Sequence, residues 1–238
     1  MARKVLFIHD HKIMIKDGCL YSRGGLTAKI VENYKKCLGE LSICSRVIPY
    51  SEGNSLKLSD GDVKHIAFPD IMSEGGFKLI EALNVIQSSI KENDIIIIRL
   101  PSISGLMAFF FVKMLKKKYI VEVVGCAYDS YNNLPSLKGK MLAPFYFLLN
   151  KLAISFSDNI LYVSEVFLPN RYPSFGSNLC FCSDVELTID SHSLEKRVDR
   201  INNHRFDTFK LGMIGSLDAS YKGYDTVFNA IQLLNNSS

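Results

Sequence analysis

A glycine pair stands where a protein backbone could bind an anion. Gly24-Gly25 precedes an apolar helical pattern that begins at Leu26. Because glycine has no Cβ, a negatively charged group can come close to the free backbone N–H groups at the start of a helix. A plain flexible turn is the alternative, and the position after the first expected strand is what favours binding.

A loop near the C-terminus has a similar composition. Gly215-Ser216 ends an apolar stretch, and Lys222-Gly223 precedes another helical pattern. A lysine ammonium is a point charge that suits a diphosphate, although an ordinary loop is again the alternative. The chain contains neither the P-loop pattern nor the spaced glycines of a dinucleotide site, so we expect neither kind of site.

Titratable side chains lie in or just beyond the expected strands. His9, Asp10 and His11 follow the first apolar run, and Glu165 follows a later one, where helix capping is the alternative role. Glu122 interrupts an apolar strand, and a buried carboxylate is costly unless it is paired. Glu122 is therefore either a salt-bridge partner or an active-site group, and Asp129 lies in the loop beyond it.

The elements that must position these residues alternate between apolar strands and helices. Continuous apolar runs, such as the four isoleucines at 95–98, are typical of strands covered on both faces. Such alternation predicts an α/β fold with a parallel sheet and helices on both faces, in which ligands bind beyond the carboxyl ends of the strands. Those ends are the loops after Ile8, Leu100, Val124 and Val163.

The expected elements alternate along the chain. We expect strands at 5–8, 43–49, 63–68, 94–99, 119–124 and 159–163, and loops at 9–25 and 126–135. We expect helices at 26–41, 77–91, 103–117 and 137–156, and a short helix or turn near Phe167.

The alternation stops after residue 184 and restarts near the C-terminus. We predict a first domain at 1–190, a polar linker at 191–208 with a short helix at 194–201, and a second start at 209–238. That last segment offers one strand, at 209–214, one loop and one helix, which cannot bury their own apolar faces. Either the unit packs against the first domain, or it begins a second domain that is cut short.

Composition narrows the function classes. The net charge of +4 is mild, and no basic stripe with interleaved aromatic residues occurs, so we expect no nucleic-acid partner. The six cysteines lack zinc-ligand spacing, which predicts free thiols in a reducing cytosol and no metal site.

No signal peptide precedes the first strand, and no apolar stretch is long enough to span a bilayer. Lysines at 113, 116–118, 138, 140 and 151 are either solvated helix ends or an edge that meets anionic lipid.

Short segments in a characteristic order resemble bacterial family-4 glycosyltransferases of the branch found in polysaccharide and O-antigen gene clusters. The segments are HDH at 9–11, YSRGGL at 21–26, IRLPS at 98–102, VEVVG at 121–125, LYVSE at 161–165, RYP at 171–173, IGSL at 214–217 and YKGYD at 221–225. Each match is short, but together they cover nearly the whole chain.

The resemblance implies the GT-B fold, with two Rossmann-like domains and the active site between them. It implies a retaining transfer from a nucleotide sugar to a saccharide or lipid-linked saccharide, with no metal or other cofactor, because cationic side chains and helix N-termini neutralise the leaving nucleotide. The residues that it assigns are Gly24, Gly25, Gly215, Ser216, Lys222 and Gly223 to the donor diphosphate, and His9, His11, Arg99 and Glu165 to the acceptor side, with Glu122 and Asp129 as catalytic candidates.

Three departures from the family pattern limit this expectation. Many relatives have arginine where this chain has Ser216, and relatives of this branch often have an acidic residue where Cys126 stands. The family's pair of glutamates, seven residues apart in the second domain, would lie beyond Ser238. We therefore expect a truncated cytoplasmic transferase, at most peripheral at the inner membrane face, that is inactive alone.

Two other functions stay open at this point. The chain could be a non-catalytic, acceptor-binding subunit of a split transferase that needs a partner polypeptide. It could also be an unrelated nucleotide-binding α/β protein, which the missing phosphate-binding patterns disfavour.

Overall fold

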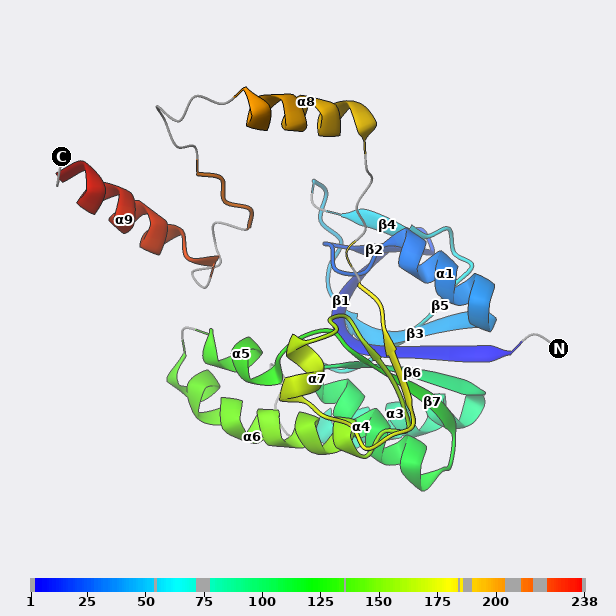
Figure 1. Ribbon diagram of the computed structural model, residues 1–238. Helices are drawn as coiled ribbons and strands as arrows, with labels where there is room; N and C mark the ends of the chain where they lie inside the picture. Colours follow the sequence, from blue (N-terminus) through cyan, green and yellow to red (C-terminus); the bar gives the residue numbers. More distant parts are fainter. Residues whose placement is uncertain are drawn as a thin grey trace. The chain divides into compact units, whose positions relative to one another are not determined.

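The isoleucine run forms β6 (Ile95–Leu100), which is a central strand of a mainly parallel sheet. It pairs with β1 (Lys4–Lys16) on one side and with β7 (Lys118–Val123) on the other. Helices cover both faces of the sheet, and the predicted α/β class is confirmed. Figure 1 shows the computed structural model, which describes residues 3–53, 55–71, 78–134, 136–183, 185, 190–203, 211–215 and 222–236.

The chain divides into two units, Met1–Asp184 and Val185–Ser238. The sheet and its helices belong to the first unit. Its described strands beyond β1, β6 and β7 are β2 (Cys19–Ser22), β3 (Glu40–Val47), β4 (Leu56–Ser59), β5 (Lys64–Ala67), β8 (Asn159–Tyr162) and β9 (Asn178–Phe181). Its described helices are α1 (Ala28–Leu38), α3 (Lys78–Glu92), α4 (Ile103–Met114), α5 (Ala127–Asn132), α6 (Leu137–Ser155) and α7 (Phe167–Arg171).

The parallel strands follow the spatial order β5, β3, β1, β6, β7, β8, β9. The chain leaves β1 toward β3 on one side and later returns to β6 on the other, so the strand order reverses between β1 and β6. In open α/β sheets the crevice at such a switch point is the usual ligand site. The expected site residues His9 and Arg99 come from these two strands.

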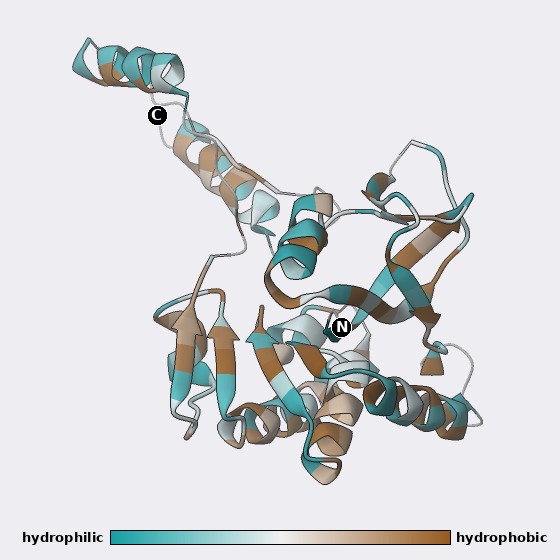
Figure 2. Cartoon of the chain, turned by 90° about the vertical axis from the view of Figure 1, so that its right-hand side faces the viewer, coloured by the Kyte–Doolittle hydropathy of each residue, from teal (hydrophilic) through white to brown (hydrophobic). Residues whose placement is uncertain are grey.

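Two hydrophobic cores hold the sheet between its helices. One core lies between the sheet and α1, and it includes Phe7, Val31 and Ile97. The other lies against α3, α4 and α6, and it includes Ile98 and Tyr146. Figure 1 shows α1 on one side of the sheet and α3, α4 and α6 on the other, and Figure 2 shows hydrophobic residues along the strands and on the helices beneath them.

The sequence located most of these elements. Apart from β1, the boundaries of the predicted strands and long helices in the first unit differ from the structure by no more than three residues. Serines set two of the helix starts. Ser102 accepts a hydrogen bond from the Gly105 N–H at 3.0 Å at the start of α4, and Ser136 accepts one from the Gly139 N–H at 3.1 Å at the start of α6.

The predicted loop at 9–25 was wrong. β1 continues to Lys16 and turns through Asp17 and Gly18 into β2, which pairs with it antiparallel. Both turn residues have positive φ, at +50° and +74°, as a two-residue hairpin turn requires. The polar run from His9 to Lys12 concealed this strand, because polar residues weaken the apolar pattern that marks a buried one.

Three smaller predictions need correction. The loop predicted at 126–135 contains the short helix α5, and β4, which pairs with β2, was not predicted. In the second unit, residues 211–214 are described without strand structure, whereas a strand was predicted at 209–214. A strand needs a neighbour to satisfy its backbone hydrogen bonds, and the described part of this unit offers no other strand. Residues 209 and 210 lie outside the described residues.

A carboxylate joins β1 to the helix that follows β6. Asp10 Oδ2 accepts a hydrogen bond from the Ile103 N–H at 2.6 Å, and Asp10 Oδ1 accepts one from the Ser104 N–H at 3.0 Å. A negative charge at a helix N-terminus is stabilised by the free N–H groups and the helix dipole. Arg46 of β3 donates to the Asp10 carbonyl through Nε at 3.0 Å and through Nη2 at 2.7 Å.

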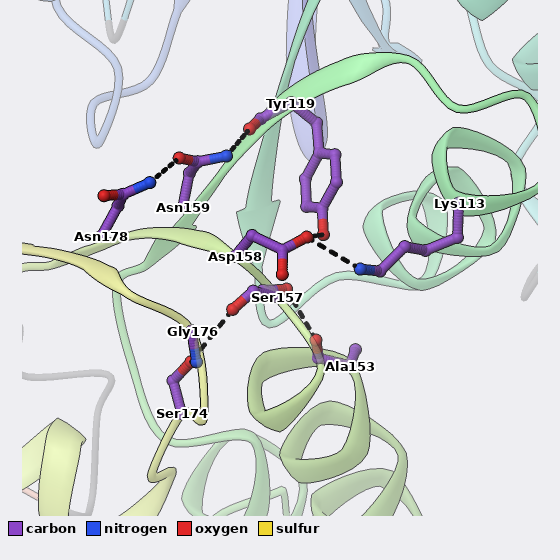
Figure 3. Close-up of polar contacts among 9 residues, drawn as sticks. All are labelled: Lys113, Tyr119, Ala153, Ser157, Asp158, Asn159, Ser174, Gly176 and Asn178. Atoms are coloured by element: carbon purple, nitrogen blue, oxygen red, sulfur yellow. Dashed lines mark hydrogen bonds and ion pairs between the residues drawn. The ribbon is translucent and has the colours of Figure 1, made fainter.

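Polar side chains fix the opposite end of the sheet, where β8 and β9 begin (Figure 3). Asp158 Oδ2 accepts from Lys113 Nζ at 3.0 Å and from the Tyr119 hydroxyl at 3.2 Å. Asn159 Nδ2 donates to the Tyr119 carbonyl at 3.3 Å, and Asn178 Nδ2 donates to Asn159 Oδ1 at 2.9 Å. These contacts connect the ends of α4 and α6 to three neighbouring strands.

The second unit contains two described helices, α8 (Ser191–Asn202) and α9 (Tyr224–Asn236). α8 confirms the helix predicted at 194–201, and Asp190 caps it by accepting from the N–H groups of His192 and Ser193. The described residues of this unit include no buried side chain. Among all described residues, no helix has both the length and the apolar composition of a membrane span.

We expect Asp10→Ala to lower the free energy of unfolding by about 1–2 kcal/mol, because two N–H groups at the start of α4 lose their acceptors. Urea unfolding followed by circular dichroism would measure the loss. The matched control is Asp129→Ala, since Asp129 also lies in the first turn of a helix but is half exposed, and it should cost less than about 0.5 kcal/mol. Equal losses in the two variants would contradict this role of Asp10.

Candidate functional site

The candidate site lies at the carboxyl end of the parallel part of β1. Ile8 is the last β1 residue that is in register with β6, opposite Ile98. The register between β1 and β3 then shifts between Ile8 and Lys12, so the pairing of these strands is irregular here. Successive side chains of a strand alternate in direction, so His9 and His11 point to one face while Asp10 points to α4 on the other.

His9 and His11 line a cavity of about 220 Å³ at the switch point between β1 and β6. We call it the switch-point cavity. It brings together four of the residues that the sequence predicted, His9, His11, Gly25 and Arg99. Its complete lining is Phe7, His9, His11, Gly25, Leu26, Arg99 and Val124.

The glycine pair is held by a buried serine. Ser22, at the end of β2, is fully buried, and its hydroxyl donates to the Gly24 carbonyl at 2.9 Å and accepts from the Gly24 N–H at 3.1 Å. His11 Nε2 lies 2.6 Å from the same hydroxyl. The tautomer of His11 decides which of these two groups donates in the contact.

The glycines themselves have backbone conformations that other residues adopt rarely. The φ angle is +116° at Gly24 and +78° at Gly25. A Cβ atom added at Gly25 would lie 3.7 Å from His11 Cε1, so a side chain there would reduce the space in the cavity. Thr27 caps the helix that follows, since its Oγ1 accepts from the Ile30 N–H at 3.3 Å.

Burial and positive charge keep both histidines neutral. The pKa of His9 is lowered to about 3, first by burial and then by the charges of Arg99, His11 and Arg46. The pKa of His11 is also lowered, first by burial and then by Arg99 and Arg46. At neutral pH the cavity therefore presents two uncharged imidazoles beside the nearly buried guanidinium of Arg99. Such a site can hydrogen-bond hydroxyl groups and bind an anionic group, while the lowered pKa values make the imidazoles weak proton acceptors.

Glu122 lies outside the lining of this cavity. It is buried in β7, in register with Arg99, and it accepts a hydrogen bond from the Tyr34 hydroxyl of α1 at 2.5 Å. Tyr34 and Glu122 contribute to a second, more apolar cavity of about 670 Å³ between α1 and strands β6 to β9. A hydrogen bond from Tyr34 thus pairs the buried carboxylate, and both predicted alternatives, a salt-bridge partner and an active-site group, stay open.

The remaining acidic candidates are also outside the switch-point cavity. Asp129 lies on α5, with Oδ1 3.9 Å from Arg171 Nη2. Glu165 is exposed, and the neighbouring Ser164 makes the capping contact, accepting from the Leu168 N–H at 3.0 Å. Cys126, where relatives often have an acidic residue, is a buried thiol that contacts Arg171 Nε at 3.0 Å and the Tyr172 hydroxyl at 3.4 Å.

In the second unit, the predicted anion loop is described in part. A Cβ at Gly215 would lie 3.0 Å from Lys222 Cγ, so the glycine lets the lysine stem pack against the backbone. The Tyr224 hydroxyl donates to the Gly215 carbonyl at 2.8 Å, and Gly223 has a φ of +77°. Ser216 lies outside the described residues.

Sequence reasoning missed several residues that organise the site. Ser22 was only part of a matched segment, and Arg46 and Tyr34 were not singled out. A serine two residues before a glycine pair weakly predicts a turn in which the serine side chain hydrogen-bonds to the backbone. The six cysteines are free thiols, as predicted. Within the described part of the chain, no group of three or more His, Cys, Asp or Glu side chains could hold a metal ion.

Comparison with known proteins gives one relative by sequence. The chain is 31% identical over 240 residues to Protein CapJ of Staphylococcus aureus. The alignment covers 98% of this chain but 58% of CapJ, so the chain spans little more than half of that relative's length. No family model matches the sequence.

Solved structures give weaker likenesses. Sucrose-phosphate synthase of Thermosynechococcus elongatus is 12% identical with a TM-score of 0.42, over 76% of this chain and 48% of that one. A UGT transferase of Siraitia grosvenorii in complex with UDP is 11% identical with a TM-score of 0.41, over 90% of this chain and 59% of that one. Scores this low support no conclusion about function.

We expect the stability of the protein to fall as the pH drops from about 6.5 toward 3. The pKa of His9 is lowered on folding, so the unfolded chain binds the additional proton in this range, and folding loses up to about 1.4 kcal/mol per pH unit. The His9→Gln variant has no titratable group at this position, so its unfolding binds no additional proton there. Urea unfolding at pH 7, 6 and 5 should therefore show a smaller loss for His9→Gln than for the unmodified chain.

The control for this measurement is His192→Gln, because His192 is exposed on α8. Its stability should follow the unmodified chain at each pH. If the loss between pH 7 and pH 5 is the same with and without His9, the neutral buried state of His9 is refuted.

Proposed function

We propose that this chain is the acceptor-side domain, with the beginning of the donor-side domain, of a family-4 glycosyltransferase of the GT-B type. It would transfer a sugar with retention from a nucleotide sugar to a saccharide or lipid-linked saccharide, in polysaccharide or O-antigen biosynthesis. The observation that carries this proposal is the switch-point cavity, where His9, His11, Gly25 and Arg99 meet. The relation to CapJ, which extends over nearly the whole chain, is consistent with a shared domain.

The size of the cavity favours a small polar group over a complete cofactor. Pockets for drug-sized ligands hold about 300–1,000 Å³, whereas this cavity holds about 220 Å³. One sugar ring or one phosphate group is therefore a better match than a dinucleotide. The neutral imidazoles of His9 and His11 would hydrogen-bond acceptor hydroxyl groups, and Arg99 would attract an anionic group of the acceptor or donor.

The start of α4 argues against the alternative of a nucleotide-binding protein. Helix N-termini bind phosphates through free N–H groups, but the first N–H groups of α4 already donate to Asp10 and Ser102. A phosphate at this point would have to displace a carboxylate that belongs to the fold. Of the glycine pair, only Gly25 lines the cavity, and the Gly24 N–H already donates to the Ser22 hydroxyl.

In the proposed reaction, the bond between the sugar C1 and the diphosphate oxygen breaks and a bond to the acceptor oxygen forms on the same face of the sugar. The acceptor hydroxyl passes its proton to the departing diphosphate oxygen, because the lowered pKa values of His9 and His11 make their imidazoles weak bases that can only orient the hydroxyl group. The negative charge that develops on the diphosphate is stabilised by nearby cationic and N–H groups. The residues proposed to bind the diphosphate, without a metal ion, are Gly24 and Gly25 of the first unit and Gly215, Ser216, Lys222 and Gly223 of the second.

The donor site is proposed to need residues beyond those of this chain. Gly215, Lys222 and Gly223 form only one loop of it, and the chain spans 58% of CapJ. We therefore expect no sugar transfer by the 238-residue polypeptide alone. Sequencing the gene past the codon for Ser238 would reveal whether a domain with two glutamates seven residues apart follows.

The direct test is a transferase assay on the longest product of that reading frame. Release of nucleoside diphosphate from a panel of nucleotide sugars would be measured with a membrane extract as acceptor, and the anomer of the product would be determined by NMR. Transfer that requires the added domain, or a co-purifying partner chain, supports the proposal. Stabilisation of the chain by ATP or a nicotinamide dinucleotide, without any transfer, would refute it.

We expect Gly25→Ala to lower kcat/KM of the transferase at least about tenfold, since the new methyl group enters the cavity beside His11. Gly18→Ala is the matched control, because Gly18 also has a positive φ, at +74°, but no atom would lie within 4 Å of its added Cβ. Both variants carry a similar backbone strain of about 1–2 kcal/mol. Only Gly25→Ala should reduce the activity, and equal effects would show that strain alone is responsible.

A further inference from the structure

We propose that the outer face of α6 is a docking surface for an anionic lipid bilayer. We call it the α6 face, and it consists of Leu137, Met141, Phe145, Leu148, Leu152 and Phe156. This proposal is independent of the proposed catalytic activity, because it concerns where the first unit binds and not what it converts.

The α6 face is a continuous apolar stripe on the outside of the unit. Its residues follow one another at intervals of three or four positions, which places them on one side of the helix. All six are exposed, and Met141 and Phe145 remain 81% and 60% accessible. Isolated exposed hydrophobic residues are common on proteins, but an aligned row of this length marks an interaction site.

The opposite side of α6 is firmly packed. Ala143, Tyr146, Ala153 and Ile154 are buried against the core of the first unit. Asn150 Nδ2 donates to the Tyr146 carbonyl within the helix at 2.8 Å. The helix therefore already has its place on the sheet, and the α6 face is additional apolar surface that this packing does not need.

The apolar surface continues from α6 onto α4. A groove of about 430 Å³ between α3, α4 and α6 has an entirely apolar lining, which includes Leu83, Phe109 and Leu149. Phe110 and Met114 of α4 are exposed beside this surface. A groove of this kind suits hydrocarbon, since none of the side chains that line it offers a hydrogen bond.

The charges around the α6 face select an anionic partner. α6 contains Lys138, Lys140 and Lys151 and no aspartate or glutamate. Within the described part of the chain, none of these lysines pairs with a carboxylate, whereas Lys113 at the end of α4 is bound to Asp158. Lysines beside an apolar stripe can extend toward lipid headgroups while the stripe enters the boundary of the acyl chains.

The same features make a protein partner a poorer match. Protein interfaces are depleted in lysine at their centres, whereas the helix that carries the α6 face contains Lys138, Lys140 and Lys151. A bilayer surface also fits the geometry, because α6 has 19 residues and extends for about 28 Å along one line. We therefore commit to a membrane containing acidic phospholipids as the occupant.

Vesicle sedimentation with the purified chain tests the proposal without any nucleotide sugar. The chain should bind vesicles of phosphatidylcholine and phosphatidylglycerol, and binding should weaken at high salt and with phosphatidylcholine alone. A double variant, Met141→Gln with Phe145→Ser, should lower the partition coefficient at least about tenfold. A second variant, Lys140→Glu with Lys151→Glu, should remove the preference for phosphatidylglycerol.

The matched control is Leu56→Ser, because Leu56 is 57% exposed and lies on β4, which pairs with β2 at an edge of the sheet. It should bind as the unmodified chain does. Circular dichroism would establish that each variant is folded, which is expected because all the substituted side chains are on the surface. Unchanged binding of the Met141 and Phe145 variant would overturn the proposal. The proposal would also be overturned if the chain formed a dimer in solution that binds no vesicles and that this variant abolishes. A second copy of the chain would then cover the α6 face.

Discussion

The bond between the Asp10 carboxylate and the first N–H groups of α4 is the interaction on which the site depends. It connects the two parallel strands on either side of the switch point, since Asp10 belongs to β1 and α4 follows β6. Because Asp10 is held on one face of β1, its neighbours His9 and His11 must point to the other. Arg46 holds the same residue from β3 through its carbonyl group, so three strands meet at one backbone position.

Much of the fold could be read from the sequence because the signals were strong and local. The isoleucines of β6 could only be a strand covered on both faces, and the apolar periods of α3 and α6 gave those helices almost to the residue. The hairpin was missed although Asp17-Gly18 is a typical turn pair, because the polar residues from His9 to Lys12 interrupted the apolar pattern. These polar residues lie where β1 extends past its pairing with β6, at the candidate site. Function requires polar side chains at such a place, so the apolar pattern that marks a buried strand is absent there.

The site could be predicted only to the level of the sheet edge. Parallel topology placed His9, His11 and Arg99 at neighbouring strand ends, and the structure brings them to one cavity with Gly25. Topology could not show that Tyr34 would bind Glu122 across 88 residues, or that Ser22 would connect His11 to Gly24. Such contacts depend on distances of a few tenths of an ångström and on helix orientation, and residue types in one sequence do not determine either.

The position of the histidines within a strand, and not in a loop, also restricts how this protein can change. In a loop, insertions and deletions can reshape a binding site at little cost. In β1, one inserted residue before His9 would reverse the direction of every side chain up to the hairpin. Asp10 would then point into the cavity, and the cap of α4 would be lost with the same event. New acceptor preferences at this site should therefore arise through substitutions at fixed length, and indels should be confined to segments outside β1.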